Sequence, residues 1–246
     1  MLNISLRLSA IKRIFSNGIA ASSSRYVSTD TGESNIYELR KYSLTPHGMP
    51  KFLELLEKNY HLRTQHSPFW GYWIADLGAL NQVIHIWEYE NFAHRTAVRT
   101  ALAKDKEWQE SFVQKAFPYV AHQTNSIVLK ANWCDLHMDK TDTGCFELST
   151  YGMRVGGPRV WEENLKSSLL AHARLEYADL IGTWYTDVGD HNTVEVLWRY
   201  ELADARREGR NKAHSDRIVV NKVRDNLKNV VSHRNVLMSP LPFLKR

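Results

Sequence analysis

Cysteine is scarce and long apolar segments are absent from this sequence. Its 246 residues contain two cysteines, Cys134 and Cys145, and their spacing matches no zinc-binding pattern. We expect both to be free thiols, the ordinary state in a reducing compartment. No stretch approaches the ~20 consecutive apolar residues that a membrane-spanning helix requires, so no transmembrane segment is predicted.

The common sequence signatures of catalysis and cofactor binding are also absent. We find no Ser-His-Asp signature, phosphate-binding loop or dinucleotide fingerprint, and the glycines at 156–157 indicate a turn before Pro158. His61 and His66 lie five residues apart, whereas two metal ligands on one helical face need a spacing of four. We therefore expect no catalytic residue, no metal ion and no cofactor.

Acidic residues are absent from the first 29 positions, where four basic residues and several serines occur. A basic, serine-rich segment whose apolar residues can share one helical face is typical of a mitochondrial presequence. We assign residues 1–30 to such a presequence and expect a mitochondrial location, in the matrix, with exposure at the outer surface as the alternative. These four residues account for most of the net charge of +5. The nearly neutral remainder gives no electrostatic reason to bind nucleic acid.

One segment occurs twice in the chain. Residues 71–90 read GYWIADLGALNQVIHIWEYE, residues 182–201 read GTWYTDVGDHNTVEVLWRYE, and nine of the twenty aligned positions are identical. Ordinary residue frequencies would give about one identity. The chain is therefore predicted to contain a first repeat at residues 35–129, a linker at 130–144 and a second repeat at 145–240.

Both repeats have the same predicted order of elements. In the first repeat we expect a strand at 36–42, a helix from Pro50, a hairpin at 69–89, a helix at 92–117 and a strand at 123–129. The second repeat follows suit, with a charged helix at 204–229. This order is typical of a split βαβ, ferredoxin-like unit, whose helices cover only one sheet face. We predict an α+β fold in which the second ferredoxin-like unit covers the free sheet face of the first, either as two sheets face to face or as a closed barrel.

Strand alternation brings the polar candidates to common faces. Glu38, Arg40 and Tyr42 share one face of the first strand, and His85 and Trp87 share one face of the third. Such a polar stripe can line a barrel interior, where a partly desolvated carboxylate or imidazole can act as a base. The alternative is a structural Glu38–Arg40 ion pair with the tryptophans packed in the core. The candidate ligand pocket between the two sheets consists of Glu38, Arg40, Tyr42, Trp73, His85 and Trp87.

An ordered set of features resembles the NipSnap family of mitochondrial proteins. These are the presequence, the duplicated unit, the opening YELRKY, the Gly71-x-Trp73 pattern followed by IWEY, and the SPLP tail. The resemblance covers residues 35 to 244. It implies a dimeric α+β barrel fold, a mitochondrial location, no firmly established catalysis, and the recruitment of autophagy receptors to damaged mitochondria. Ser149 and Thr150 stand where the first repeat has Arg40 and Lys41, so a site built on Arg40 exists once only.

A short motif in the linker suggests a protein partner. Trp133 and Leu136 are separated by two residues within an acid-containing segment. This pattern resembles the extended motif that autophagy modifiers bind by strand addition, with the aromatic and the leucine in alternate pockets. The alternative is that Trp133 plugs the junction between the repeats.

These observations lead to a main functional hypothesis and two alternatives. The main hypothesis is a mitochondrial adaptor without catalysis, which recruits protein partners such as autophagy receptors or modifiers in mitochondrial quality control. The first alternative is a small-molecule-binding protein or enzyme that uses the cavity around Glu38, Arg40 and His85. The second is a structural homo-oligomer.

Overall fold

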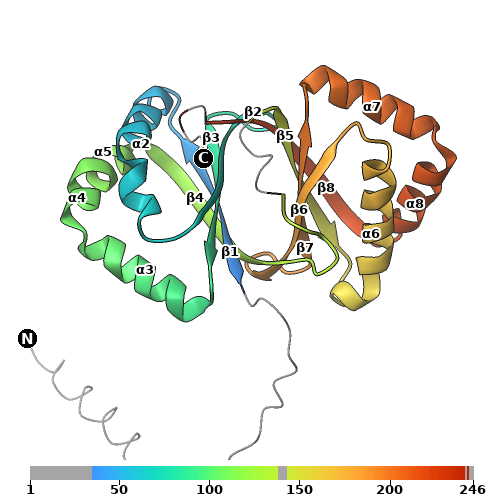
Figure 1. Ribbon diagram of the computed structural model, residues 1–246, viewed down its shortest axis with the longest axis horizontal. Helices are drawn as coiled ribbons and strands as arrows, with labels where there is room; N and C mark the ends of the chain where they lie inside the picture. Colours follow the sequence, from blue (N-terminus) through green and yellow to red (C-terminus); the bar gives the residue numbers. More distant parts are fainter. Residues whose placement is uncertain (1–34, 138–142, 242, 244–246) are drawn as a thin grey trace, which may run out of the picture. The chain divides into compact units, whose positions relative to one another are not determined.

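The computed structural model describes residues 35–137, 143–241 and 243. Eight strands form one closed antiparallel barrel and the helices lie outside it (Figure 1), which confirms the predicted α+β class. No helix in these residues is long and apolar enough to cross a membrane. The strands are β1 (Ile36–Leu44), β2 (Phe69–Leu77), β3 (Gln82–Tyr89), β4 (Val120–Lys130), β5 (Cys145–Met153), β6 (Asp179–Val188), β7 (Thr193–Tyr200) and β8 (Val230–Pro240).

The strand order of the barrel follows the sequence repeat. Around the barrel the order is β1-β3-β2-β8-β5-β7-β6-β4. Within the first repeat, β1 lies between β3 and β4, and within the second repeat β5 lies between β7 and β8. The pairs β2–β8 and β4–β6 join the two halves. Neither half therefore keeps a free sheet edge.

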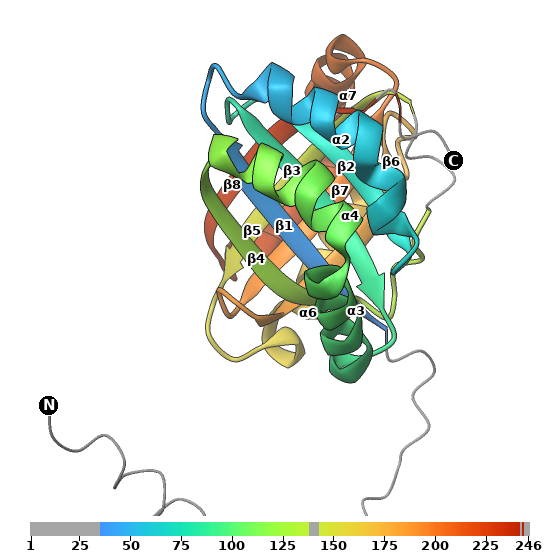
Figure 2. The same ribbon diagram turned by 90° about the vertical axis from the view of Figure 1, so that its left-hand side faces the viewer.

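The helices of each repeat cover the outer face of its own strands (Figures 1 and 2). Pro50 and Pro158 lie in the first turns of α2 and α6, where a missing N–H costs no hydrogen bond. The helical elements are α2 (Met49–Thr64), α3 (Phe92–Lys104), α4 (Lys106–Trp108), the π-helical η1 (Gln109–Val113), α5 (Gln114–Ala116), the 3₁₀ turn η2 (Phe117–Tyr119), α6 (Pro158–Ala173), α7 (Ala203–Ser215) and α8 (Arg217–Leu227).

Both long helices expected near the ends of the repeats are interrupted. Asp105 ends α3, and its carboxylate accepts a hydrogen bond from the backbone N–H of Trp108. Asp105 is thus the N-cap of the next segment, α4. Asp216 does the same between α7 and α8. The apolar periodicity continues across each aspartate, so the pattern alone reads as one helix, whereas the N-cap preference of Asp breaks it in two.

Large apolar side chains from both repeats fill the middle of the barrel interior. Trp73 and Trp184 lie there, each about 1% exposed, with Tyr37, Phe146 and Leu148. A Cβ atom at Gly71 would collide with the ring of Trp73, and one at Gly182 with the ring of Trp184. The repeated Gly-x-Trp pattern therefore serves packing, because the glycine leaves room for the indole that follows it.

Candidate functional site

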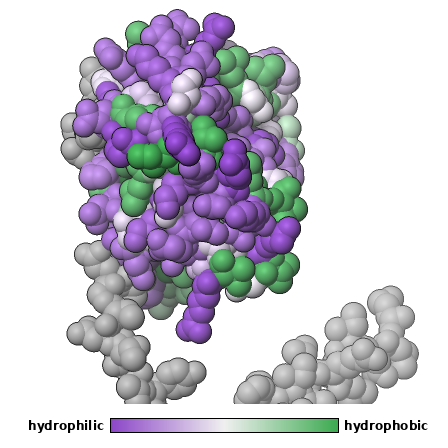
Figure 3. Space-filling view, turned by 90° about the vertical axis from the view of Figure 1, so that its right-hand side faces the viewer, coloured by the Kyte–Doolittle hydropathy of each residue, from purple (hydrophilic) through white to green (hydrophobic). Residues whose placement is uncertain are grey.

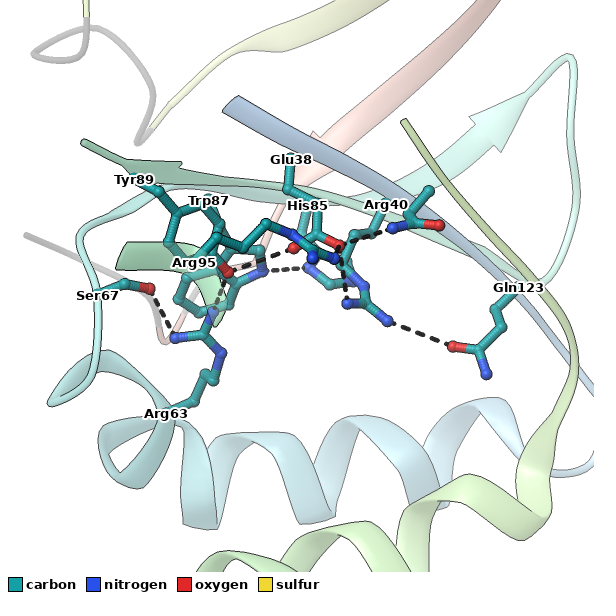
Figure 4. A network of polar contacts seen from close by, with 10 residues as sticks. Glu38, Arg40, Arg63, Ser67, His85, Trp87, Tyr89, Arg95 and Gln123 are labelled. Carbon is teal, nitrogen blue, oxygen red and sulfur yellow. Dashed lines mark hydrogen bonds and ion pairs between the residues drawn. The ribbon is translucent and has the colours of Figure 1, made fainter. Parts of the chain in front are cut away.

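A buried carboxylate lies on the helix-facing side of the first repeat (Figure 4). Glu38 is fully buried and accepts hydrogen bonds from Arg95 at 2.7 Å, Asn125 at 2.8 Å and Arg40 at 3.2 Å. Burial alone would raise the pKa of Glu38, but the hydrogen bond from Arg95 and the charge of Arg40 bring it below its ordinary value. The carboxylate is therefore ionised and fully paired.

The second repeat contains the same network at equivalent positions. Glu147 is also fully buried and accepts hydrogen bonds from Arg206, from Asn235 at 2.7 Å and from Tyr200 at 2.9 Å. Its pKa is about 2, because these hydrogen bonds outweigh burial. Glu38 and Glu147 have equivalent partners in the two repeats. This favours the alternative in which Glu38 forms a structural ion pair over the one in which it acts as a base.

One row of side chains crosses the first half-sheet and differs from the second half. In the strand register, Arg40 of β1 pairs with His85 of β3, and His85 pairs with Tyr72 of β2. The imidazole of His85 stacks on the Tyr72 ring at 4.4 Å with an interplanar angle of 2°. The indole N–H of Trp87 donates to Nδ1 of His85 at 2.6 Å. This row therefore fixes both the plane and the tautomer of His85.

His85 presents an N–H group without an acceptor. Because the indole can only donate, Nδ1 accepts and the proton of the neutral ring is on Nε2. Burial, followed by the charges of Arg40 and Arg63, lowers the pKa of His85 well below its ordinary value, so the ring is neutral at pH 7. Nε2 is buried and has no hydrogen-bond partner among the described residues.

This row borders a cavity of 220 Å³ between the half-sheet and the helical segments α2, α3, α4, η1 and η2. The cavity is lined by three arginines, Arg40, Arg63 and Arg99. No acidic side chain lines it. The Nε of Arg40 is a second buried donor without a partner in the described part of the chain. Aromatic rings form most of the remaining wall, from Tyr42, Tyr60, Phe69, Tyr72, Trp87, Trp108, Phe112 and Phe117.

Arg63 is held rigidly on the other side of His85 from Arg40 (Figure 4). Its guanidinium lies 3.7 Å above the Trp87 ring and donates to Ser67 at 2.8 Å and to Tyr89 at 2.9 Å. The strand patterns that indicate the other pocket residues do not indicate Arg63, which lies on α2. The available signal was its spacing, since Arg63 lies seven residues after Leu56 on the buried stripe of α2.

The structure brings four of the six predicted pocket residues together at this cavity. Arg40, Tyr42, His85 and Trp87 line it, and Glu38 lies behind Arg40. Trp73 does not belong to it, since its ring packs on the opposite face of the sheet in the barrel interior. These residues therefore do not line a pocket between the two sheets, where the sequence pattern predicts one. The alternation along each strand holds, but the stripe of Glu38, Arg40 and Tyr42 faces the helices, and apolar side chains occupy the middle of the interior.

The predicted partner motif is packed against the barrel. The indole N–H of Trp133 donates to the hydroxyl of Tyr185 at 2.7 Å, and Leu136 packs against the interior apolar cluster. The backbone N–H of His137 donates to Ile181 of β6 at 3.0 Å. A partner that takes up Trp133 and Leu136 must first release both from these contacts.

The family model described as NIPSNAP matches the chain twice, at residues 37–135 and 146–245. The chain belongs to the NIPSNAP family. It is 46% identical to human NipSnap homolog 3A over 208 residues, which are 84% of each chain. It is 26% identical to a NipSnap homolog of Dictyostelium discoideum over 215 residues, which are 85% of this chain and 89% of that protein.

Two solved structures of putative monooxygenases have the same fold. A putative monooxygenase from Fusobacterium nucleatum matches 86% of this chain and 94% of its own with a TM-score of 0.61 and 9% identity. A putative monooxygenase from Lactobacillus acidophilus matches 84% and 94% with a TM-score of 0.58 and 12% identity. At these identities the likeness concerns the fold alone.

Proposed function

We propose that this NIPSNAP-family protein binds a small aromatic anion in the cavity of its first repeat. The observation that carries the proposal is a pair of buried donors beside one cavity. His85 Nε2–H and Arg40 Nε–H lack acceptors among the described residues. A buried donor without an acceptor costs about 1–3 kcal/mol, which a ligand carboxylate would recover.

The charge around the cavity favours an anion over a neutral ligand. Its lining has three arginines and no carboxylate, and Glu38, just behind, is already bound by Arg40, Arg95 and Asn125. Positive charge around this cavity is therefore only partly compensated. Hydrogen bonds from guanidinium groups to carboxylates are roughly twice as strong as neutral ones.

The size and walls of the cavity favour a single or fused aromatic ring. A dry apolar cavity of about 150 Å³ accommodates benzene, whereas sites for drug-sized ligands begin near about 300 Å³. The volume of 220 Å³ lies between these values. Aromatic walls suit a planar apolar body, so benzoate-like and naphthoate-like acids are the chemical class that fits.

The proposal is a binding function and contains no reaction step. A general base needs a free lone pair, but the Nδ1 lone pair of His85 already accepts from Trp87, and Nε2 carries the proton. The ionised Glu38 is sequestered by its arginines. In this arrangement His85 orients an acceptor atom of the ligand.

Isothermal titration of the full chain with benzoate and with benzamide tests this function. Benzamide has nearly the same shape but no charge, so we expect benzoate to bind at least about tenfold more tightly, or about 1.4 kcal/mol. Arg40→Ser and His85→Val introduce the residues that the second repeat carries at the equivalent positions. Each should weaken benzoate binding at least about tenfold.

Arg174→Ser is the matched control, because Arg174 is an exposed arginine bound to Asp216 outside the cavity. Its affinity for benzoate should equal that of the parent chain. Equal affinities for benzoate and benzamide, or a Kd that Arg40→Ser and His85→Val leave unchanged, would refute the proposal.

Three finer interpretations remain proposals beside this one. The strand order and the two family-model matches support two ferredoxin-like units arranged within one chain as in a dimeric α+β barrel. The mitochondrial location rests on residues 1–30, which lie outside the described residues. The adaptor function in mitochondrial quality control rests on the family resemblance. If it uses Trp133 and Leu136, replacing both with alanine should abolish binding to an autophagy modifier, and unchanged affinity would exclude this motif.

A further inference from the structure

A second cavity, of 340 Å³, lies in the second repeat between its half-sheet and helices α6, α7 and α8. Figure 3 views the molecule from the side that carries these helices, where hydrophilic residues dominate and apolar ones form separate areas. Aromatic side chains line the sheet side of the cavity, from Tyr151, Trp198 and Tyr200. Nothing in the proposed function of the first repeat uses this cavity.

Cationic and imidazole side chains converge on this cavity from four elements. Arg210 and His214 come from α7, and Arg224 comes from α8. His172 comes from α6 and His233 from β8. No acidic side chain lines the cavity. An anion is therefore the ligand that this set of side chains attracts.

The nearest carboxylate leaves Arg210 able to bind a ligand. Glu147 lies 3.9 Å from the Arg210 guanidinium, which is beyond hydrogen-bonding distance. Glu147 already accepts hydrogen bonds from Arg206, Asn235 and Tyr200. The donors of Arg210 are thus not consumed by the buried network.

Two of the imidazoles are held in place and can take up a proton when an anion binds. Nδ1 of His172 lies 2.7 Å from the Tyr177 hydroxyl, and His233 stacks on Tyr151 at 4.2 Å. Burial, with the charges of Arg210 and His214, lowers the pKa of His172 to about 4. Burial also lowers the pKa of His233, although Glu147 opposes this. A nearby negative charge would raise both pKa values.

We propose that this cavity binds a small aromatic dianion, with its ring over Tyr151 and Trp198 and its charges beside Arg210 and Arg224. The class includes aryl phosphates, because guanidinium groups suit phosphate oxygens and the aromatic floor suits the ring. Asn226 adds a buried amide oxygen without a partner in the described residues, which can accept from a donor on the ring. This dianion carries one more negative charge than the benzoate-like monoanion that we propose for the cavity of the first repeat.

Titration calorimetry of the full chain with phenyl phosphate and with benzene-1,3-disulfonate tests this proposal. Arg210→Gln and Arg224→Gln should each weaken both ligands at least about tenfold. Lys222→Gln is the matched control for Arg224→Gln. Lys222 is an exposed cation on α8, as Arg224 is, but it does not line the cavity. It should leave both affinities unchanged, as should Arg40→Ser in the first repeat.

The disulfonate carries no titratable proton near neutral pH, so proton uptake in its titration belongs to the protein. Repeating it at pH 6.5 in two buffers with different ionisation enthalpies should show uptake, which His172→Gln reduces. The proposal is overturned if neither probe binds at millimolar concentration. It is also overturned if Arg210→Gln and Arg224→Gln behave like Lys222→Gln, or if Arg40→Ser abolishes binding, because the ligand then occupies the first repeat.

Discussion

The two halves of the barrel share one buried carboxylate network and differ in the row of side chains beside it. Glu38 and Glu147 are held alike by an arginine, an asparagine and the strand neighbours. The row Arg40–His85–Tyr72 in the first half becomes Ser149–Val196–Thr183 in the second. The shared network thus holds equivalent elements together in both halves, whereas the row that differs gives the first cavity the side chains of Arg40 and His85, which the second half lacks.

The exchange of Arg40 for Ser149 illustrates how one substitution separates these roles. In the second half the Ser149 hydroxyl donates to Glu147 at 2.9 Å, and in the first half the Arg40 guanidinium donates to Glu38 at 3.2 Å. Both therefore satisfy the buried carboxylate. Each residue also borders the cavity of its own half, but only Arg40 has a second donor, Nε, that the carboxylate does not use.

Removal of either shared carboxylate should have the largest effect. Glu38→Ala and Glu147→Ala each leave buried arginines uncompensated, so each should lower the free energy of unfolding by about 3–5 kcal/mol in urea titrations. Glu54→Ala removes a carboxylate from an exposed ion pair and should change stability little. If Glu147→Ala costs no more than Glu54→Ala, the shared network is not what stabilises the two halves.

The glycines of the repeated pattern should come next. Gly71→Ala and Gly182→Ala place a methyl group against the following indole, so each should lower the unfolding free energy by about 1–3 kcal/mol. A double-mutant cycle with Trp73→Phe identifies the cause. Gly71→Ala should cost less when the smaller ring is present, and an undiminished cost would attribute the effect to the backbone instead.

A smaller effect is expected on the pH dependence of stability, to which His85 contributes and the equivalent Val196 does not. His85 has a pKa well below its ordinary value of about 6.5, so below that pH the unfolded chain binds a proton that the folded chain does not. Stability should therefore fall as the pH falls below about 6.5, by up to ~1.4 kcal/mol per pH unit from this group.

His85→Val should flatten this dependence in unfolding experiments between pH 7 and 5. Val196→Ala, at the equivalent position of the second half, should keep the slope of the parent chain. Equal slopes for the parent and His85→Val would mean that the imidazole is not buried in neutral form.

Much of the fold could be predicted from the sequence, because it is repeated and periodic. Strand alternation places Glu38, Arg40 and Tyr42 on one face, and the register bears this out. Sequence could not tell which face becomes the barrel interior, since that depends on how the halves close on each other through β2–β8 and β4–β6. The predicted residues Arg40, Tyr42, His85 and Trp87 therefore line a cavity on the helix-facing side of the sheet and not on its interior side.

The missing members of the site have a similar explanation. Arg63 and Arg99 come from helices that cross the sheet, and no pattern within a strand indicates which helical residue will lie over His85. The pairing of Tyr72 with His85 depends on the register between β2 and β3. That register is shifted by a bulge between Phe69 and Gly71, which the sequence pattern does not indicate. Tertiary contacts of this kind arise only when the elements pack.

The state of His85 tests the central claim most directly. Nitrogen-15 NMR of histidine-labelled protein at pH 7 should show a neutral ring with the proton on Nε2, identified by its loss in His85→Val. Saturation with benzoate should shift the Nε2–H resonance as it gains an acceptor. A charged ring, a proton on Nδ1, or an Nε2–H resonance that benzoate leaves unmoved would contradict the account.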